Sequence, residues 1–533
     1  MKLSFYGADQ CVTGSCHCLE INDTRILIDC GLQQGRDEVS NGEFPFAANT
    51  IDYVLVTHAH IDHSGRIPML IKQGFKGRIL TTRLTAQLLE IMLLDSAHIQ
   101  EQDAEWKNRK GERSGAPRTE PLYTVEDAER VKDFLVVCEY GELINLCEGV
   151  DIEFTDAGHL LGSAFVAMDL RENGVKKSIV FSGDIGNINQ PVIRDPVQLA
   201  GADYVVMEST YGDRNHPESW GYTDELARII DETMARGGNV IIPSFAVGRT
   251  QELLYFIREI KEQHMVCSCP DFPVYIDSPL AKKATSIFDG DLRGYMDHDA
   301  VWLVRKGTNM FRFPNLHTTE SSEESKALNE DRTPKVIISA SGMCDAGRIR
   351  HHLKHNLWRP ECTILFVGFQ GEGTLGRQLL EGAESVKLFG EEITVRARLE
   401  NFTGLSSHAD RDHLLKWISG FQHPKPQHVF VVHGDREVAP HFAQTLENMG
   451  ISAHAPQYTE VYDLATGTIL ERGYLPERKV KLVTGSKGAP AYERLASVGN
   501  MLTEFIKRSK GRDNKSLAKY ASELRQLLEK WEA

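Results

Sequence analysis

The segment VLVTHAHIDHSGRIPML, residues 54–70, joins an apolar run to four side chains that are able to bind metals. His58, His60, Asp62 and His63 follow this run within six positions. A spacing of two residues at a strand end directs His58 and His60 to the same side, and Asp62 and His63 follow on the turn. Nitrogen and carboxylate ligands without thiolate suit Zn²⁺, with Mn²⁺ or Fe as alternatives. The pattern therefore predicts a metal centre with enough donors to border two ions.

A centre of two metals needs further ligands, and the sequence offers them after other apolar runs. His159 in DAGHLLGSA, Asp184 in FSGDIG and His433 in VVHGD each follow such a run and are flanked by glycine. We expect them to meet at strand ends, where the sites of α/β proteins are assembled. Asp184 is the expected bridge, because a carboxylate offers one oxygen to each ion. Asp29 in LIDCG also follows an apolar run and precedes a glycine. We expect it to orient a metal-binding side chain by a hydrogen bond without binding the metal itself.

The elements that must position these residues alternate through the first 210 residues. Segments 68–74 and 85–102 are typical of helices. Runs rich in Ile, Val or Phe that end in polar residues predict six strands, at 25–31, 52–60, 78–82, 150–159, 177–184 and 203–210. This alternation predicts a layered α/β architecture.

The pattern changes near residue 213 and returns near residue 396. A separate α/β segment spans 213–395 and opens on an amphipathic helix, with Thr223 as its expected N-cap and Gly237 just past its end. We therefore expect the first domain to be interrupted by a second one. The expected domains are 1–212, the inserted 213–395, the completing 396–475 and the helical extension 476–533.

The extension after residue 475 has a helical pattern. Its apolar residues recur at spacings of three and four, namely Leu517, Tyr520, Leu524, Leu527 and Trp531. Residues 477–533 hold 13 Lys plus Arg against 7 Asp plus Glu, so basic charge gathers there. The helix is expected either to pack on its own domain or to contact a partner, such as a second copy in a homodimer.

Composition sets further limits. A chain of 533 residues is too long for one compact core, and its 41% hydrophobic and 25% charged content is ordinary for a soluble globular protein. No apolar run is long enough to span a membrane, and the start has no secretory h-region. The ten cysteines are too sparse for a disulfide framework, so we expect reduced thiols and a cytoplasmic protein. The net charge of −15 argues against broad nucleic-acid binding but leaves room for a local cationic channel.

These motifs together resemble a known superfamily. HxHxDH with the downstream GH, SGD and HG is similar to the metallo-β-lactamase fold, an αββα sandwich. The segments MESTYGDR, PSFAVGRTQELL, SASGM and GFQGEGTLGR, with LSSHAD and VVHGD, resemble the β-CASP branch of nucleic-acid nucleases. The resemblance covers about residues 1–475. It is strongest to the bacterial and archaeal homologues of the pre-mRNA cleavage and polyadenylation specificity subunit, and then to the RNase J group.

The resemblance implies a role for each matched residue. Two Zn²⁺ ions are implied, one bound by His58, His60 and His159 and the other by Asp62, His63 and His433, with Asp184 bridging. Glu208 matches motif A and is expected to bond a motif histidine, and His408 matches motif B, where the family places a general acid. His433 matches motif C. DNA-processing members of the branch typically lack histidine there, which favours RNA as the substrate.

The reaction implied is hydrolysis of phosphodiester bonds in single-stranded RNA, by endonuclease or 5′–3′ exonuclease action. Two metal ions make hydroxide available near neutral pH and neutralise phosphate charge. The inserted domain is expected to hold the RNA backbone without reading its bases. The candidate phosphate-binding residues lie in SASGM, VGRTQ and GTLGR, and they are Ser339, Ser341, Gly342, Arg249 and Arg377.

Three other functions fit parts of this pattern. A small-molecule hydrolase would share the metals, but such enzymes generally lack an insert over the site and a His408/His433 pair. A DNA nuclease would share the fold. A scaffold subunit would have lost metal ligands, whereas every expected ligand is present here.

Overall fold

The structure is a computed structural model, and the chain in it divides into two compact units, Met1–Glu477 and Arg478–Ala533. It describes residues 1–34, 41–112, 117–217, 221–368, 370–371, 373–402, 405–476, 499, 502, 506 and 517–525. In the second unit, residues 517–525 are helical and carry Leu517, Tyr520 and Leu524. Leu527 and Trp531, the other members of the predicted helical pattern, lie outside the described residues.

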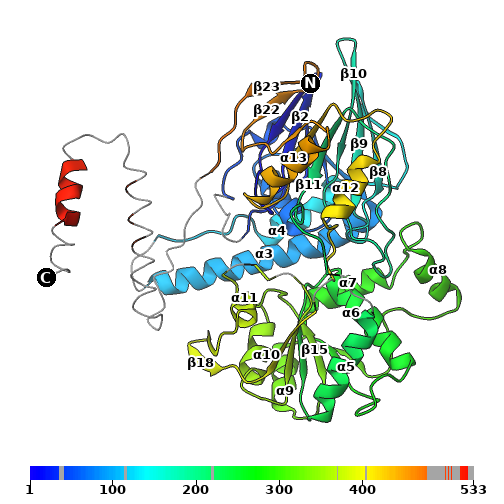
Figure 1. Ribbon diagram of the computed structural model, residues 1–533, viewed down its shortest axis with the longest axis vertical. Coiled ribbons are helices and arrows are strands. Elements are labelled where there is room, and N and C mark those ends of the chain that lie inside the picture. Colours follow the sequence, from blue (N-terminus) through cyan, green and yellow to red (C-terminus); the bar gives the residue numbers. More distant parts are fainter. Residues whose placement is uncertain are drawn as a thin grey trace. The chain divides into compact units, whose positions relative to one another are not determined.

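Two large sheets build one end of the first unit (Figure 1). The first has eight strands in the order β23-β22-β1-β2-β3-β4-β5-β6. Its strands are β1 (Lys2–Phe5), β2 (His17–Ile21), β3 (Thr24–Ile28), β4 (Tyr53–Leu55), β5 (Arg78–Thr82), β6 (Leu135–Cys138), β22 (Val461–Asp463) and β23 (Thr468–Glu471). The second has seven strands in the order β21-β20-β11-β10-β9-β8-β7. These are β7 (Ile144–Cys147), β8 (Val150–Asp156), β9 (Ala164–Glu172), β10 (Val175–Phe181), β11 (Tyr204–Glu208), β20 (His428–Val432) and β21 (Ala453–His454).

The two sheets pack face to face and are covered by helices on their outer faces. Buried side chains from both sheets, such as Phe5 and Ile28 from the first and Phe154 and Phe430 from the second, form one core. On the outer faces, α2 (Ile67–Lys72) and α3 (Arg83–Gly111) cover the first sheet. The second sheet is covered by α12 (Arg411–Ser419) and α13 (Val438–Asn448). This arrangement confirms the predicted four-layer αββα sandwich.

Four further short helices lie in the connections between the strands of the sandwich. They are η2 (Ala48–Thr50), α1 (Ile61–Ser64), α4 (Val125–Glu129) and η4 (Arg130–Phe134). All ten cysteines are free thiols. Within the described ranges, none of the helices is both long enough and apolar enough to cross a membrane.

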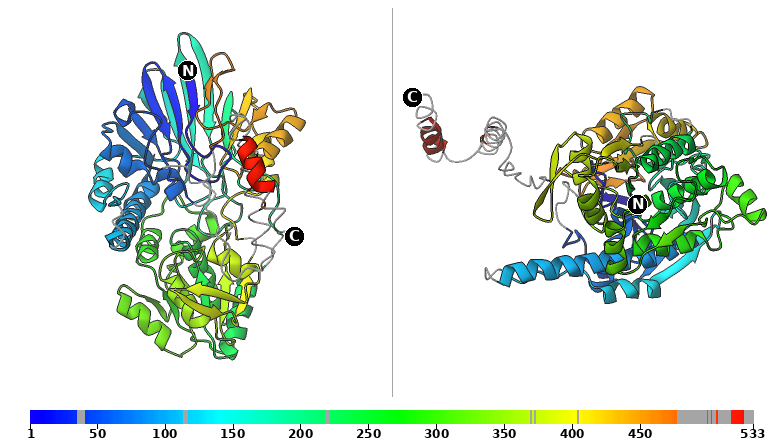
Figure 2. Two further views of the ribbon diagram at one scale, coloured as in Figure 1. Left: turned by 90° about the vertical axis from the view of Figure 1, so that its left-hand side faces the viewer. Right: turned by 90° about the horizontal axis from the view of Figure 1, so that it is seen from below.

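A third sheet lies at the other end of the first unit (Figure 2). Its six strands pair in parallel in the order β14-β13-β15-β12-β16-β19. They are β12 (Val240–Pro243), β13 (Val274–Ile276), β14 (Leu316–Thr318), β15 (Val336–Ser339), β16 (Thr363–Phe366) and β19 (Arg398–Asn401), and β17 (Ser385–Leu388) and β18 (Glu391–Thr394) form a separate hairpin. Because the strands are parallel, all their carboxyl ends lie at one edge of the sheet.

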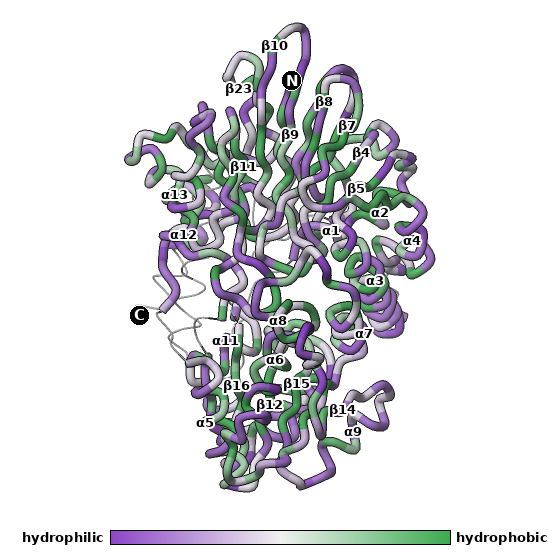
Figure 3. Tube along the Cα trace, turned by 90° about the vertical axis from the view of Figure 1, so that its right-hand side faces the viewer, coloured by the Kyte–Doolittle hydropathy of each residue, from purple (hydrophilic) through white to green (hydrophobic). Residues whose placement is uncertain are grey.

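Helices connect these parallel strands. They are α5 (Tyr222–Ala235), α6 (Arg249–Glu262), α7 (Pro279–Phe288), α8 (His298–Arg305), α9 (Ser322–Glu330), α10 (Ile349–Asn356) and α11 (Leu375–Leu380). Hydrophobic residues lie along strands of the sheets and also on helices that cover them (Figure 3). The apolar residues of β12, β15 and β16 are fully buried, as expected for a parallel sheet covered on both faces.

The predicted N-cap of α5 is wrong by two residues. The cap is Gly221, and Thr223 lies inside the first turn, where its hydroxyl donates to a Glu259 carboxylate oxygen at 2.9 Å. Gly237 follows the helix end with a φ of +74°, as the sequence predicts. The sequence pattern assigned the Thr223 hydroxyl to helix capping, but in the structure this hydroxyl bonds a residue of α6.

After the third sheet the chain returns to the sandwich. Strand β20 pairs in parallel with β11, and β22 pairs with β1 at the start of the chain. Segments nearly the whole sequence apart therefore lie side by side. This return is what brings residues near 433 to the same strand ends as residues near 58 and 184.

Candidate metal centre

The HxHxDH segment begins where β4 ends. β4 stops at Leu55, and His60 is the N-cap residue of α1, the short helix that contains Asp62 and His63. His58 and His63 are fully buried. An extended stretch followed by one helical turn therefore points several imidazoles and a carboxylate into the same space.

Four side chains form a first metal-binding group. Their ligand atoms lie within 4.8 Å of one another, and the group is His58, His60, His159 and Asp184. The Nδ1 atom of His60 lies 3.1 Å from His58 Nε2 and 3.2 Å from His159 Nε2. Asp184 Oδ2 lies 3.3 Å from His58 Nε2 and 3.4 Å from His159 Nε2. Three imidazole nitrogens and one carboxylate oxygen thus converge.

Asp62, His63 and His433 form a second group at the same strand ends. The Nε2 atom of His433 lies 3.5 Å from Asp62 Oδ2. His63 Nε2 lies 3.2 Å from Asp184 Oδ1. Asp184 therefore turns one oxygen toward each group, which is the geometry of a bridging carboxylate.

The donor set fits divalent metal ions. His63 Nε2 and Asp184 Oδ1 are buried 3.2 Å from each other, and among the described residues neither atom makes a hydrogen bond of good geometry. Buried polar atoms left in this way are costly unless something binds them. Neutral imidazole nitrogens and carboxylate oxygens are the ligands of zinc and related metals in proteins.

The electrostatics of the groups favour bound cations. Burial lowers the pKa of His60 to about 3, so this imidazole is neutral and able to ligate. Burial alone would also lower the pKa of His63, yet the charges of Asp184 and Asp29 raise it well above its ordinary value. Burial opposes ionisation of Asp184, but the nearby histidines hold its pKa well below the ordinary value. The ionised carboxylates therefore stabilise positive charge in the pocket, whether it is carried by these histidines or by a bound cation.

Asp29 and Thr57 orient His63 from behind. Asp29 Oδ2 lies 2.7 Å from His63 Nδ1, so the opposite nitrogen faces the metal-binding group. The Thr57 backbone N–H and hydroxyl donate to the two Asp29 oxygens at 2.8 and 2.9 Å. Such bonds fix the tautomer and ring orientation of a metal ligand.

His433 is positioned by the loop that follows β11. The hydroxyl of Thr210 lies 3.0 Å from His433 Nδ1, and the His433 backbone N–H donates to the Ala8 carbonyl at 2.9 Å. A Cβ on the next residue, Gly434, would lie 2.2 Å from the Ser209 hydroxyl oxygen, so a larger residue there would displace Ser209. Sequence analysis did not single out Thr57 or Thr210. The only sequence signal for them is that each stands next to a motif, Thr57 in THAH and Thr210 in ESTY.

His408 and Glu208 lie beside the two groups. The Nδ1 atom of His408 is 3.1 Å from Glu208 Oε1, and the two rings of His408 and His159 have centroids 4.5 Å apart. Glu208 is fully buried and also accepts the Ile185 backbone N–H at 2.6 Å. Burial would lower the pKa of His408, but the charges of Glu208 and Asp184 outweigh it and raise the pKa to about 9. His408 is therefore held as a proton carrier.

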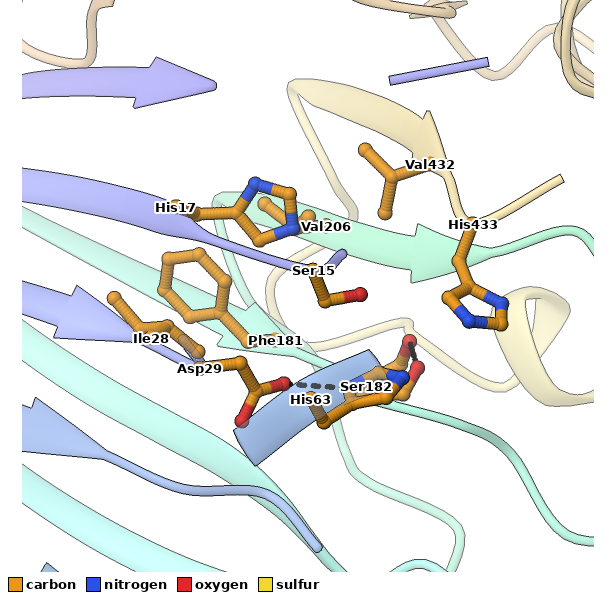
Figure 4. Close-up of a pocket in the computed structure, with 11 residues that line it drawn as sticks. Ser15, His17, Ile28, Asp29, His63, Phe181, Ser182, Val206, Val432 and His433 are labelled. Atoms are coloured by element: carbon orange, nitrogen blue, oxygen red, sulfur yellow. Dashed lines mark hydrogen bonds and ion pairs between the residues drawn. The ribbon is translucent and has the colours of Figure 1, made fainter. Parts of the chain in front are cut away.

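Two further histidines adjoin the centre and were missed from the sequence. His216 Nε2 donates to the His408 carbonyl at 2.9 Å, and its ring packs against Tyr211. His17 lines a small buried cavity behind His63 and His433 (Figure 4). Burial lowers the pKa of His17 to about 4. Both histidines reach the site from sequence-remote elements, which a motif search cannot reveal.

The predicted phosphate-binding residues separate into two sets. Ser339 is buried and donates its hydroxyl to the Asp277 carbonyl at 3.0 Å, and the buried Arg249 is bound to Glu252 and the Leu405 carbonyl. Both side chains are engaged within the fold, and their expected role as phosphate donors stays a prediction.

The other candidates remain at the surface or in a loop. Ser341 donates weakly to the Ala346 carbonyl at 3.3 Å, and the Arg377 side chain is 44% exposed beside Glu381. Gly342 lies in the loop after β15. These groups stay available for contact with an anion.

Comparison with protein-family models finds three matches along the chain. Residues 10–137 match the metallo-beta-lactamase superfamily. Residues 250–379 match the Beta-Casp domain. Residues 392–456 match the Zn-dependent metallo-hydrolase RNA specificity domain.

Individual proteins are similar over most of the chain. Ribonuclease TTHA0252 from Thermus thermophilus is 38% identical over 82% of this chain and 94% of its own length. An RNase J-like protein from Methanocaldococcus jannaschii is 31% identical over 83% of this chain and 95% of its own. The transcription termination factor FttA of the same organism is 30% identical over 84% of this chain and 69% of its own.

Proposed function

The chain belongs to the metallo-β-lactamase superfamily and carries a β-CASP domain, and from this premise we propose that it is a metal-dependent ribonuclease that hydrolyses single-stranded RNA. The observation that carries the proposal is the convergence of two histidine–carboxylate groups on Asp184, with His408 beside them. The names of two similar proteins, a ribonuclease and an RNase J-like protein, support RNA as the substrate.

We propose that the centre holds two Zn²⁺ ions, with Mn²⁺ or Fe as alternatives. The ligands would be His58, His60 and His159 for one ion and Asp62, His63 and His433 for the other, with Asp184 between them. Two divalent cations in such a site lower the pKa of water and offset the charge of a phosphate. Asp29 and Thr210 would hold the rings of His63 and His433 in the ligating orientation.

His408 is the proposed general acid. Its Nδ1 is engaged by Glu208, so Nε2 is the nitrogen that remains to give a proton to the leaving 3′-oxygen. In the metal-free protein the charges of Glu208 and Asp184 raise the pKa of this ring, which favours its protonated form. Glu208 holds the ring and stabilises its charge, and His216 fixes the backbone carbonyl of the same residue.

The proposed domain boundaries remain 1–212, 213–395, 396–475 and 476–533. The family matches at 10–137, 250–379 and 392–456 support this division. The division of the chain after Glu477 supports a separate extension. We further propose a cytoplasmic enzyme, which suits its free thiols. A homodimer through the extension stays a hypothesis.

The test is cleavage of 5′-labelled single-stranded RNA by the full chain, with DNA of the same sequence alongside. We expect fragments from RNA in the presence of zinc, none with chelator, and recovery when metal is restored. Internal fragments would indicate an endonuclease and released mononucleotides an exonuclease. Intact RNA under every metal condition would contradict the proposal, and hydrolysis of a β-lactam such as nitrocefin would instead favour a small-molecule enzyme.

A pair of aspartate variants controls this experiment. Asp184→Ala removes the proposed bridge and should abolish cleavage. Asp169→Ala removes an exposed carboxylate from β9, the strand next to β10 in the same sheet, and should cleave as wild type. Equal activity in the two variants would show that the centre is elsewhere.

A further inference from the structure

Phe245 is an exposed aromatic ring at the carboxyl edge of the third sheet. It follows β12, which lies between β15 and β16, and 45% of the side chain is exposed. Open parallel sheets bind their ligands in the loops at this edge. Singly exposed apolar side chains are common on protein surfaces, so it is the place of this ring at the ligand-binding edge that makes it a candidate contact for a ligand.

Glycines of the two neighbouring loops make room for the ring. A Cβ on Gly342 would lie 3.1 Å from two atoms of the Phe245 ring, and a Cβ on Gly368 would lie 3.9 Å from the ring. Gly342 follows β15 and Gly368 follows β16. The ring is therefore placed against backbone from both neighbouring strands, and side chains at these two positions would narrow the space around it.

Hydrogen bonds join described residues of the two loops around the ring. Gln370 is buried, and its amide nitrogen donates to the Gly342 carbonyl at 2.9 Å and the Gly368 carbonyl at 3.1 Å. The Phe245 carbonyl accepts the Thr250 hydroxyl at 2.7 Å. These bonds hold the backbone on both sides of the ring, and a preorganised site loses less conformational freedom when a ligand binds.

Among the described residues, most other exposed aromatic rings have a cation or a ring beside them, and Trp358 is the exception. Lys110 lies 3.8 Å from the ring centre of Trp106, and Lys306 lies 3.5 Å from that of Trp302. Phe389 stacks with a histidine ring at 4.3 Å. Across the part of the chain that the structure describes, no such cation or ring lies over Phe245.

The loop that carries Phe245 contacts residues that are close in sequence to His159 and His408. A Cβ on Gly248 would lie 3.1 Å from the side chain of Leu160, the residue after His159. Arg249 in the same turn binds the Leu405 carbonyl, three residues before His408. An RNA strand that extends from the metal centre would therefore pass near this edge of the third sheet.

We propose that Phe245 is a stacking platform for one base of single-stranded RNA held across the metal centre. This inference rests on the proposed ribonuclease function and adds a binding residue to it. Every nucleobase has a π-face, so stacking on an aromatic side chain helps to hold a single strand without reading its sequence. Duplex RNA keeps its bases stacked on one another and offers none to the ring.

The experiment measures RNA affinity of Phe245→Ala, Phe245→Trp and Trp358→Ala in the full chain. Fluorescence anisotropy with labelled single-stranded RNA in chelator gives Kd, and initial rates with zinc give KM and kcat. Phe245→Ala should raise Kd and KM about 5- to 150-fold, the span expected for losing one stacked base. Phe245→Trp should restore binding, because the indole also stacks.

Trp358 is the matched control because its ring is equally exposed, at 46%, but precedes β16 and so lies at the opposite edge. Its alanine variant should bind RNA as wild type. RNAs with a single abasic site sharpen the test. One abasic position should weaken binding to the wild type but not to Phe245→Ala, because that variant has already lost the stack.

Two failures are distinguishable. Wild-type protein that neither binds nor cleaves RNA would overturn the proposed function itself. Wild-type protein that cleaves RNA, with Phe245→Ala unchanged in Kd, KM and abasic response, would overturn only the stacking inference. A loss that Phe245→Trp fails to restore, or that Trp358→Ala reproduces, would also overturn it.

Discussion

At the scale of single residues, His408 is the side chain with the most direct chemical role. We predict that His408→Ala slows RNA cleavage about 10²- to 10⁴-fold, the usual contribution of a general acid. His408 lies with Asp184 and Glu208 in a third cluster of possible ligand atoms, but it is not one of the seven proposed ligands, so zinc content should stay near that of wild type. Single-turnover kinetics and elemental analysis measure the two quantities. Loss of metal together with activity would refute the assignment of His408 as the acid.

The carboxylate beside His408 should control the pH dependence. The folded pKa of His408 is raised, so its proton is present at neutral pH and is lost as pH rises through that pKa. Glu208→Gln removes one of the charges that raise it, so the pKa should fall. NMR titration of the imidazole in chelator-treated protein should show about 9 for wild type and a lower value for the variant. The alkaline limb of the cleavage profile should move to lower pH, and an unmoved limb would contradict the role of Glu208.

Residue chemistry was partly readable from the sequence. The contiguous HxHxDH segment and the Gly-flanked His159, Asp184 and His433 all follow apolar strands, and the structure gathers them at one set of strand ends. Thr57, Thr210 and His216 could not be found in this way. Their roles depend on a partner atom brought near by the fold, and a hydroxyl or imidazole in a loop is too common to be a signal.

At the scale of elements, the third sheet is anchored by a buried aspartate that follows β13. Asp277 is fully buried and accepts hydrogen bonds from side chains of three other elements, namely Thr319, Ser325, Arg348 and His352. Burial disfavours its charge, but these bonds hold the pKa of Asp277 below its ordinary value. The network ties the loop after β14 to α9 and α10.

We predict that Asp277→Ala destabilises the protein by about 3–5 kcal/mol, the usual cost of removing one partner of a buried charged pair. The remaining donors would be left buried without an acceptor. Urea denaturation measures the change. Asp299→Ala, an exposed position in the first turn of α8, is the control and should change stability by less than about 1 kcal/mol. Equal stability of the two variants would show that the network contributes nothing.

Element types were predicted better than the use of their polar side chains. The six strands expected in the first 210 residues all appear, because runs rich in Ile and Val suit buried sheets. Thr223, Ser339 and Arg249 were assigned to capping or phosphate contact, yet each bonds a residue remote in the sequence. Local pattern cannot show which tertiary acceptor a side chain will meet.

At the scale of the whole molecule, metal binding should stabilise the first unit. The ligands come from the loop after β4, the ends of β8 and β10, and the returning strand β20, so bound ions would join parts that lie far apart in sequence. A ligand that binds only the folded state adds stability, about 2.7 kcal/mol at a concentration of 100 Kd.

We therefore predict a higher melting temperature for zinc-loaded than for chelator-treated protein. Differential scanning calorimetry at a fixed protein concentration measures the difference. Asp184→Ala should lose most of the zinc response, whereas Asp169→Ala should keep it. If zinc does not change the melting temperature of the wild type, the result would contradict a metal centre whose ligands come from all of these segments.

The most direct test of the central claim is anomalous X-ray diffraction at the zinc edge from crystals of the zinc-loaded protein. The account predicts two peaks about 3.5–4 Å apart, as in other two-metal sites. One should lie among His58, His60 and His159 and the other among Asp62, His63 and His433, with Asp184 between them. No peak at these residues, or a single peak remote from Asp184, would contradict the account.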